Sequence, residues 1–157
     1  MDSLLETTEI ERIQFIVVQF GEEQYGINIK YIDNIVRMQH ITRVPQVPHY
    51  IKGVINLRGE VIPVVSIRLK MGLEPDEITK NTRIIIIRLD NGELIGMLVD
   101  QVKEVVTLES SQIDQASYDS TAKGEMANFL SGVGKNGEDL ISLLDLNLVF
   151  ADKDKDK

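Results

Sequence analysis

The fold is indicated by residues 51–67, which have the sequence IKGVINLRGEVIPVVSI. A related stretch, LSGVGKNGEDLISLLDL, follows 79 positions later at residues 130–146. Each stretch has two runs of β-forming residues on either side of a glycine-containing turn, which is the pattern of a β-hairpin. Each ends with an N-cap residue, Ser66 or Asp145, before a short apolar segment that predicts a helical turn. A repeat of this kind indicates two copies of one small structural unit.

A second pair of similar segments precedes the first pair in each copy. Residues 15–29 and 85–99 are related at an offset of 70 positions, and Gly26 and Gly96 occupy matched places. Since the offset grows from 70 to 79 along the chain, the second copy has a longer connection, which we place in the polar stretch 107–128. The sequence does not decide whether this connection is ordered.

Composition limits the classes of protein to which the chain can belong. Its 157 residues suffice for one ordinary domain or two very small ones. The absence of cysteine excludes disulfides and thiolate metal sites. No apolar run approaches the roughly 20 residues of a membrane helix, and the N-terminus lacks the pattern of a signal peptide. We therefore expect a cytoplasmic protein that does not insert into the membrane.

The charge and the aromatic content argue against a nucleic-acid partner. A formal charge of −8 repels a phosphate backbone. An RNA-binding barrel would need stacking aromatics and a basic stripe, but only 5% of the residues are aromatic and tryptophan is absent. A small RNA-binding barrel is therefore a weak alternative.

Short strands in hairpins predict an all-β protein of two small barrel units, with short helices at strand connections. The units are expected to cover about 13–72 and 83–150 within one domain of residues 12–150. Residues 1–11 are predicted to form a flexible tail, and residues 151–157 a disordered one. The sequence does not show whether the barrels follow one another or exchange strands.

No catalytic constellation is evident in the sequence. His40 and His49 lie in an extended, proline-containing loop, and Asp100 with Glu104 is interpreted as a solvated surface pair. The glycine-rich stretch 132–137 lacks the spacing of a phosphate-binding loop, and comparison with the first copy identifies it as a hairpin turn. We expect no enzymatic activity, no metal, no cofactor and no small-molecule substrate.

One motif is more specific than the repeat. Residues 51–59 contain the signature turn Asn56, Leu57, Arg58 and Gly59, and residues 61–65 follow it with the sequence VIPVV. Together with the hairpin around Gly26, these residues resemble the CheW family of bacterial chemotaxis coupling proteins, over about residues 13–150. The resemblance implies two five-stranded SH3-like barrels packed together, without an active site.

The resemblance also implies the partners. Such proteins link the cytoplasmic tip of a chemoreceptor to the histidine kinase CheA, whose regulatory domain is similar to CheW itself. The protein would then be peripherally associated with receptor arrays, and the helical hairpin of the receptor is expected to dock between the barrels. The alternative is a CheW-like module of a different sensory kinase pathway.

Family correspondence places five residues in or near the receptor-facing region: Ile32, Asn34, Arg58, Arg83 and Val105. Asn34 departs from the family pattern, which often has a glutamate there. Ile32 and Val105 are equally compatible with a position in the core. Arg58 is not required by the turn itself, because the hairpin tip of the second copy has the different sequence KNG at residues 135–137.

Overall fold

The computed structural model describes residues 11–114 and 128–151. In this part of the chain eleven strands form two sheets, and the helices are limited to single turns. The prediction of an all-β protein with short helices at strand connections is confirmed. Most of the predicted tails, 1–11 and 151–157, and residues 115–127 of the predicted connection lie outside the described residues.

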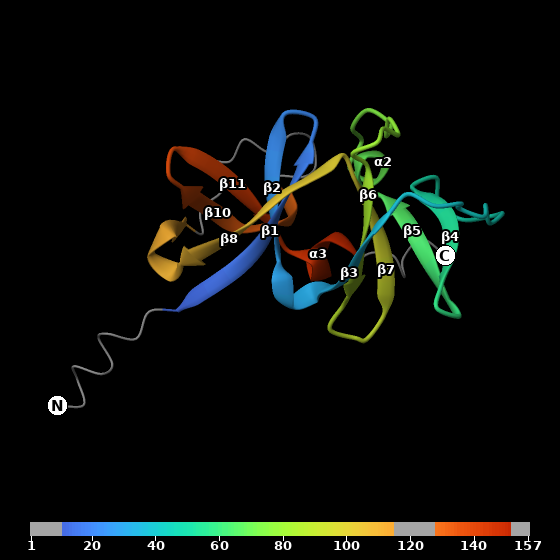
Figure 1. Ribbon diagram of the computed structural model, residues 1–157, viewed down its shortest axis with the longest axis horizontal. Helices are drawn as coiled ribbons and strands as arrows, with labels where there is room; N and C mark the ends of the chain where they lie inside the picture. The colour runs from blue at the N-terminus through green and yellow to red at the C-terminus, as the bar shows by residue number, and fades with distance from the viewer. Residues whose placement is uncertain (1–10, 115–127, 152–157) are drawn as a thin grey trace.

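The two sheets form the two halves of the molecule (Figure 1). The six-stranded sheet has the spatial order β8 (Gln101–Glu109), β1 (Arg12–Phe20), β2 (Glu23–Asn28), β11 (Asp139–Leu144), β10 (Leu130–Asn136) and β9 (Ile113–Asp114). The five-stranded sheet has the order β3 (Ile32–Arg37), β6 (Arg83–Arg88), β7 (Leu94–Val99), β5 (Glu60–Ser66) and β4 (Ile51–Leu57). Among the described residues neither series of strand pairings closes completely, but an isolated bridge between Thr42 and Val54 links the chain after β3 to β4 at the opposite edge of its sheet. The two units are therefore barrel-like, as expected, without being fully closed.

The chain crosses between the sheets at two places. The first crossing, from β2 to β3, is made by the 3-10 turn η1 (Ile29–Tyr31), and the second, from β7 to β8, by Asp100 alone. All strands from β3 to β7 therefore belong to one sheet, and the strands before and after them belong to the other.

The two sheets do not coincide with the two repeat copies. Hairpin β1–β2 belongs to the first copy, but it pairs with β8 and β11 of the second copy. Hairpin β6–β7 of the second copy likewise pairs with β3 and β5 of the first. The question left open by the sequence is thereby answered: the units exchange their first hairpins.

Each exchanged hairpin joins its new sheet through a parallel strand pair. Gly26 of β2 pairs with Leu143 of β11, and Gly96 of β7 pairs with Val64 of β5. A β-carbon on Gly26 would lie 2.8 Å from Cδ2 of Leu143, and one on Gly96 would lie 2.9 Å from Cγ2 of Ile84. Gly26 thus leaves room for a side chain of its parallel neighbour β11, and Gly96 leaves room for a side chain of its antiparallel neighbour β6.

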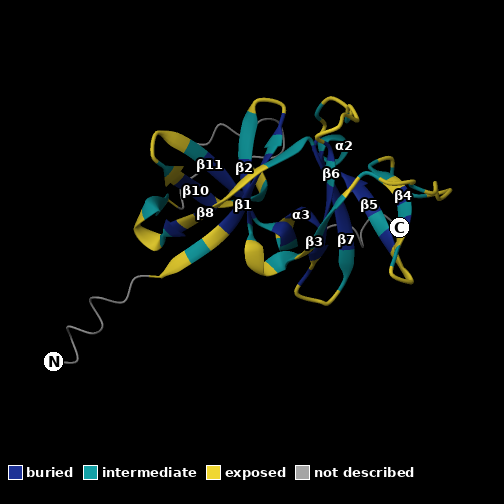
Figure 2. Cartoon of the chain, in the orientation of Figure 1, coloured by how far each residue is buried: buried dark blue, intermediate teal, exposed yellow. Residues whose placement is uncertain are grey.

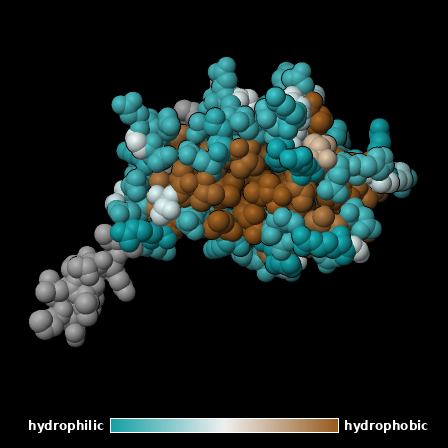
Figure 3. All heavy atoms as spheres, in the orientation of Figure 1, coloured by the Kyte–Doolittle hydropathy of each residue, from teal (hydrophilic) through white to brown (hydrophobic). Residues whose placement is uncertain are grey.

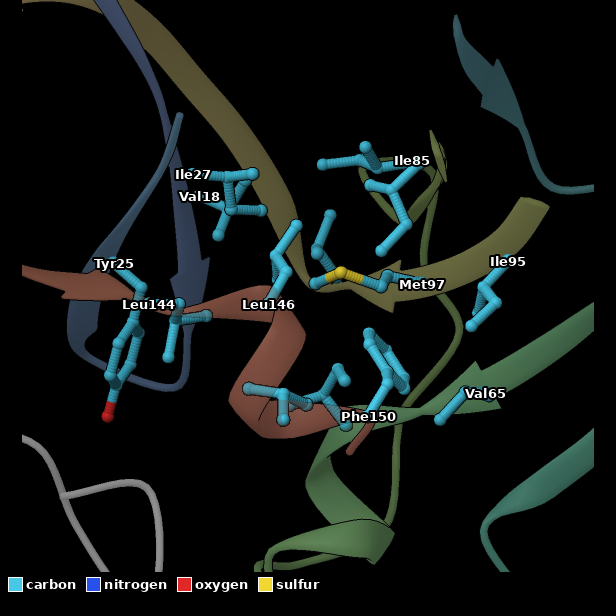
Figure 4. Packing of buried hydrophobic residues seen from close by; sticks show 14 of the residues in the cluster. Val18, Tyr25, Ile27, Val65, Ile85, Ile95, Met97, Leu144, Leu146 and Phe150 are labelled. Atoms are coloured by element: carbon cyan, nitrogen blue, oxygen red, sulfur yellow. The ribbon is translucent and has the colours of Figure 1, made fainter. Parts of the chain in front are cut away.

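The largest hydrophobic cluster lies between the sheets, and we name it the central cluster (Figure 4). Val18, Tyr25 and Ile27 reach it from the six-stranded sheet, and Val65, Ile85 and Met97 reach it from the five-stranded sheet. The helical turn α3 (Leu146–Val149) adds Leu146, Val149 and the following Phe150. Each sheet also has a smaller inner cluster of its own. The buried residues accordingly lie on strands of both sheets and on α3 (Figure 2).

The two predicted N-caps are confirmed. Ser66 Oγ accepts a hydrogen bond from the Leu69 N–H at 3.1 Å, at the start of α2 (Ile67–Lys70). Asp145 Oδ1 accepts one from the Leu148 N–H at 3.2 Å, at the start of α3. Each cap satisfies a backbone donor that the first helical turn leaves unpaired.

Gly53 marks a bulge in β4, where an added β-carbon would overlap the carbonyl oxygen of Thr42. Gly59 also has a positive φ angle, 85°, but its β-carbon would meet open space. We expect Gly59→Ala to cost about 1 kcal/mol of unfolding free energy from backbone strain. Gly53→Ala should cost more than roughly 3 kcal/mol, because backbone as well as side chains must move. Urea unfolding of both variants measures the difference, and equal losses would contradict the steric explanation.

Candidate partner-binding surface

The five candidate residues lie on four different elements of the fold. Ile32 and Asn34 are on β3, and Val105 is on β8. Arg83 is the first residue of β6, and Arg58 is in the turn between β4 and β5. Strands β3 and β8 belong to different sheets and both lie on the face shown in Figure 1, on either side of the junction between the sheets.

Strand β3 contributes two half-buried isoleucines to this junction. Ile32 and Ile35 both pack against the central cluster, and a register shift between Ile32 and Asn34 interrupts the pairing of β3 with β6. The side-chain oxygen of Asn34 accepts a hydrogen bond from the Ile35 N–H at 2.9 Å. Asn34 therefore has its amide NH₂ group available to donate, where a glutamate would offer acceptors.

Strand β8 contributes an apolar residue that is clearly outside the core. Val105 is 49% exposed, whereas its neighbour Val106 is 8% exposed and belongs to the inner cluster of the six-stranded sheet. Val102, nearer the crossing at Asp100, is half-buried against the central cluster. Ile32 and Ile35 are thus partly core and partly surface, and Val105 is surface.

Figure 3 shows hydrophobic side chains extending across this face, from β1 and β8 past α3 to β3. Among the residues of β3 and β8, those that are apolar, incompletely buried and next to the junction are Ile32, Ile35, Val102 and Val105. We name these four residues the junction surface. A contiguous apolar patch on a soluble protein is typical of an interaction site.

Arg58 has an unusual backbone conformation. Its φ angle is 54° and that of Gly59 is 85°, which is the pattern of a type I′ hairpin turn. The side chain of Asn56 stabilises the turn by accepting a hydrogen bond from the Gly59 N–H at 3.1 Å. The matching position in the second copy is Gly137, with φ of 67°. A left-handed arginine costs about 1 kcal/mol relative to glycine, so the turn does not explain why arginine is present.

Arg83 lies in a cationic environment that the sequence analysis did not identify. It stands directly opposite Arg37 in the β3–β6 pairing, and its Nη1 donates to the carbonyl oxygens of Lys80 and Thr82, both at 2.9 Å. Arg37 and Lys80 were missed because nothing in their local sequence indicates that they come together.

Asp100, at the crossing between the sheets, is held by two separate parts of the chain. It accepts hydrogen bonds from Arg68 Nε at 3.0 Å and Arg68 Nη2 at 2.5 Å, and from the Gly21 N–H at 2.7 Å. The interpretation of Asp100 and Glu104 as a solvated pair is therefore wrong for Asp100, which forms a bidentate ion pair with Arg68. The ion pair with Arg68 links α2 to the crossing, and the hydrogen bond from Gly21 links the β1–β2 turn to it.

The pKa values of Asp76 and Asp100 are shifted in opposite directions. Burial raises the pKa of Asp76, and the hydrogen bond from the Ser66 hydroxyl only partly opposes this. Burial also acts to raise the pKa of Asp100, but the hydrogen bonds from Arg68 and Gly21 outweigh it, and the pKa of Asp100 lies below its usual value. The two carboxylates thus make opposite contributions to the pH dependence of stability.

The described residues contain no group of three or more metal-binding side chains. His49 packs edge-to-face against Tyr50, with ring centroids 5.7 Å apart. The glycine-rich stretch 132–137 belongs to the β10–β11 hairpin, as interpreted, but residues 132–136 form part of strand β10 and only Gly137 lies in the turn. No helix in the described part of the chain is long and apolar enough to cross a membrane.

Comparison with known proteins gives consistent matches over most of the chain. The model of the family described as the CheW-like domain matches residues 14–154. The chemotaxis protein CheW of Helicobacter pylori is 36% identical over 134 residues, which is 85% of this chain and 79% of that protein. The one of Bacillus subtilis is 35% identical over 137 residues, covering 87% and 86%. The crystal structure of the scaffolding protein TtCheW from Thermoanaerobacter tengcongensis is similar with a TM-score of 0.78 and 29% identity, covering 91% of this chain and 90% of that one.

The carboxylate at the crossing should be important for stability. Asp100→Asn keeps the shape but removes the charge that pairs with Arg68, whose side chain is only 15% exposed. We expect a loss of roughly 2 kcal/mol of unfolding free energy at neutral pH. Asp76→Asn is the matched control: it removes a carboxylate whose ionisation burial disfavours, so it should be neutral or stabilising at pH 7.

The same two variants should differ in pH dependence. Because the pKa of Asp100 is lowered on folding, its contribution is present above the normal carboxyl pKa of about 4 and is lost as the pH falls through its folded pKa. Because the pKa of Asp76 is raised, stability increases as the pH falls through its folded value. The free energy of unfolding, measured by urea denaturation as the pH is lowered from 7, should therefore lack this increase in Asp76→Asn. A gain of the same size in the wild type and in Asp76→Asn would contradict the assignment.

Two adjacent valines of β8 differ in burial, since Val105 is exposed and Val106 is buried. Val105→Asp should fold cooperatively and lose about 1 kcal/mol or less, mainly through the low β-propensity of aspartate. Val106→Asp should lose more than roughly 3 kcal/mol, because it places an unpaired carboxylate in the inner cluster. Thermal melting monitored by circular dichroism distinguishes them. Loss of cooperative melting in Val105→Asp would place Val105 in the core.

Proposed function

The chain belongs to the CheW family, and we propose that it is a non-catalytic scaffold in chemotaxis signal transduction. In this role it couples the cytoplasmic tip of methyl-accepting chemoreceptors to the regulatory domain of the histidine kinase CheA, and it works in the cytoplasm at receptor arrays. The observation that carries the proposal is the partly exposed apolar surface at the junction of the two sheets.

The junction surface suits a helical partner. An amphipathic helix docks by placing an apolar stripe in an apolar groove, and β3 and β8 supply such side chains from two sheets. The half-buried Ile32 and Ile35 are held by the central cluster, so they need no large rearrangement on binding. We propose that the receptor's helical hairpin occupies this surface, with Val105 as its most exposed apolar contact.

Asn34 and Arg58 are proposed to add polar contacts to this complex. Asn34 lies on β3 between the two isoleucines and can donate a hydrogen bond where a glutamate could only accept one. Arg58 projects from a turn that is conformationally costly for arginine, and arginine is enriched among residues that dominate binding energy. The positive φ angle of Arg58 supports a role in binding more strongly than exposure alone does, because backbone strain of this kind persists only when another interaction compensates for its cost.

We propose the kinase as the second partner because part of it is similar in structure to this family. The regulatory domain of CheA is similar to CheW, so pairing of one sheet unit with another is the expected mode of association. Contacts of modest affinity to two partners are sufficient for an array, because linked binding sites raise the effective concentration of each partner.

The decisive experiment is co-sedimentation of the protein with receptor fragments and CheA, with kinase activity as the readout. The proposal requires that the protein enter the pellet with both partners and that kinase activity become receptor-dependent. Binding without any receptor-dependent change in activity would contradict the coupling role and favour a different sensory kinase pathway.

Two substitutions distinguish the role of the Arg58 side chain in binding from the effect of Arg58 on the backbone of the turn. Arg58→Asp should fold normally but weaken coupling, since the guanidinium is replaced by an opposite charge. Arg58→Gly should be at least as stable as the wild type, by up to about 1 kcal/mol, because glycine adopts the positive φ angle without strain. It should nevertheless lose coupling. Wild-type levels of receptor-dependent kinase activity in both variants would exclude Arg58 from the binding surface.

A further inference from the structure

Three cations line a single hollow at the end of strands β3 and β6. Arg37, Lys80 and Arg83 border a depression of about 520 Å³, together with Met38 and the turn 79–82. No carboxylate is among the described residues that line it. In a protein with a formal charge of −8, a local cluster of one positive sign is an exception.

The cluster is held in place by its own backbone. In the turn 79–82 the Thr82 N–H donates to the Thr79 carbonyl at 3.2 Å, and the Thr79 N–H donates to the Thr82 hydroxyl at 2.9 Å. Arg83 Nη1 donates to two carbonyls, those of Lys80 and Thr82. One nitrogen of the guanidinium is thus fixed by the chain, and the remaining donors of its planar fork are oriented for a further acceptor.

The arrangement is unfavourable for the isolated protein. Arg37 and Arg83 stand directly opposite one another, and like charges in such a cross-strand pair are destabilising. Among the described residues, Arg12, Arg68 and Arg88 each have an acidic partner, but neither Arg37 nor Arg83 does. A negatively charged ligand would remove this repulsion and satisfy the free donors.

We propose that Arg37, Lys80 and Arg83 bind carboxylates of acidic residues carried by the helix that occupies the junction surface. The inference rests on the proposed function and specifies the chemistry of its partner. Residues two apart in a strand point to the same face, so Arg37 lies on the face of β3 that carries Ile35. Their separation of about 7 Å in a strand is comparable to one helical turn of about 5.4 Å. A helix lying along β3 should therefore carry its acidic residues one turn beyond its last apolar contact.

A protein carboxylate fits this position better than a membrane does. Recognition of anionic lipid typically uses clusters of four to eight cations next to a membrane anchor, and here three cations belong to a strongly acidic chain. The hollow also adjoins the strand that carries half of the junction surface. An occupant of that surface reaches the cluster without a second binding event.

The test measures the affinity for a receptor helical-hairpin fragment as a function of salt concentration. Arg37→Glu and Lys80→Glu should each weaken binding roughly tenfold at low salt, mainly by slowing association, and should reduce the salt dependence. Arg43→Glu is the matched control, because it changes the charge equally at an exposed loop position lining a different depression. It should bind within about twofold of the wild type.

Reciprocal charge exchange makes the test specific. Replacing the acidic residue one turn beyond the apolar stripe of the fragment by lysine should restore the affinity of Arg37→Glu. If Arg37→Glu and Lys80→Glu both bind the fragment as the wild type does, the inference is wrong while the proposed function stands. If inorganic phosphate raises the melting temperature of the wild type but not of Arg37→Glu, without any effect of either variant on the fragment, the cluster is a free-anion site. Failure of the wild type to bind would overturn the proposed function as well.

Discussion

Two parallel strand pairs hold the structure together. In β2–β11 and β5–β7, a hairpin from one repeat copy is added to strands from the other, four in the six-stranded sheet and three in the five-stranded sheet, and the matched glycines Gly26 and Gly96 lie in these two pairs. Parallel neighbours cannot be joined by a tight turn, so each sheet is completed by a distant part of the chain. The central cluster follows from this exchange, because each hairpin buries one side against the opposite sheet. Neither repeat copy contains the strands of a complete sheet.

The binding surface is a product of the same exchange. Strand β3 starts directly after η1, and β8 starts directly after Asp100, so each strand begins where the chain leaves one sheet for the other. Ile32 and Val102, close to these crossings, are therefore only partly covered. The position of β8 depends on the Asp100 carboxylate, which links the crossing to Arg68 and to the β1–β2 turn. A partly buried electrostatic contact thus helps to set the position of an apolar surface.

Local features could be predicted from the sequence, and the long-range arrangement could not. The repeat, the hairpin identity of residues 132–137 and the caps at Ser66 and Asp145 depend on neighbouring residues, and they are confirmed. The exchange of hairpins could not be predicted from the sequence, because a strand with alternating apolar residues can pair equally well with any neighbouring strand. The pairing of Asp100 with Arg68 and the juxtaposition of Arg37 with Arg83 depend on that exchange, so they were missed as well. Resemblance to a family supplied the candidate residues on β3 and β8, and the structure adds their exposure.

The order in which the strands leave the ribosome has a consequence for folding during synthesis. Residues 32–99 contain every strand of the five-stranded sheet, so this sheet can pair as soon as β7 has emerged. Hairpin β1–β2 is made before this sheet, but its neighbours β8 and β11 are made after it. Until then the apolar side chains of β1 have no sheet to join, and contacts of such long sequence separation form slowly. Hairpin β1–β2 therefore keeps unpaired strand edges until after the five-stranded sheet has been made, and such edges are prone to aggregation.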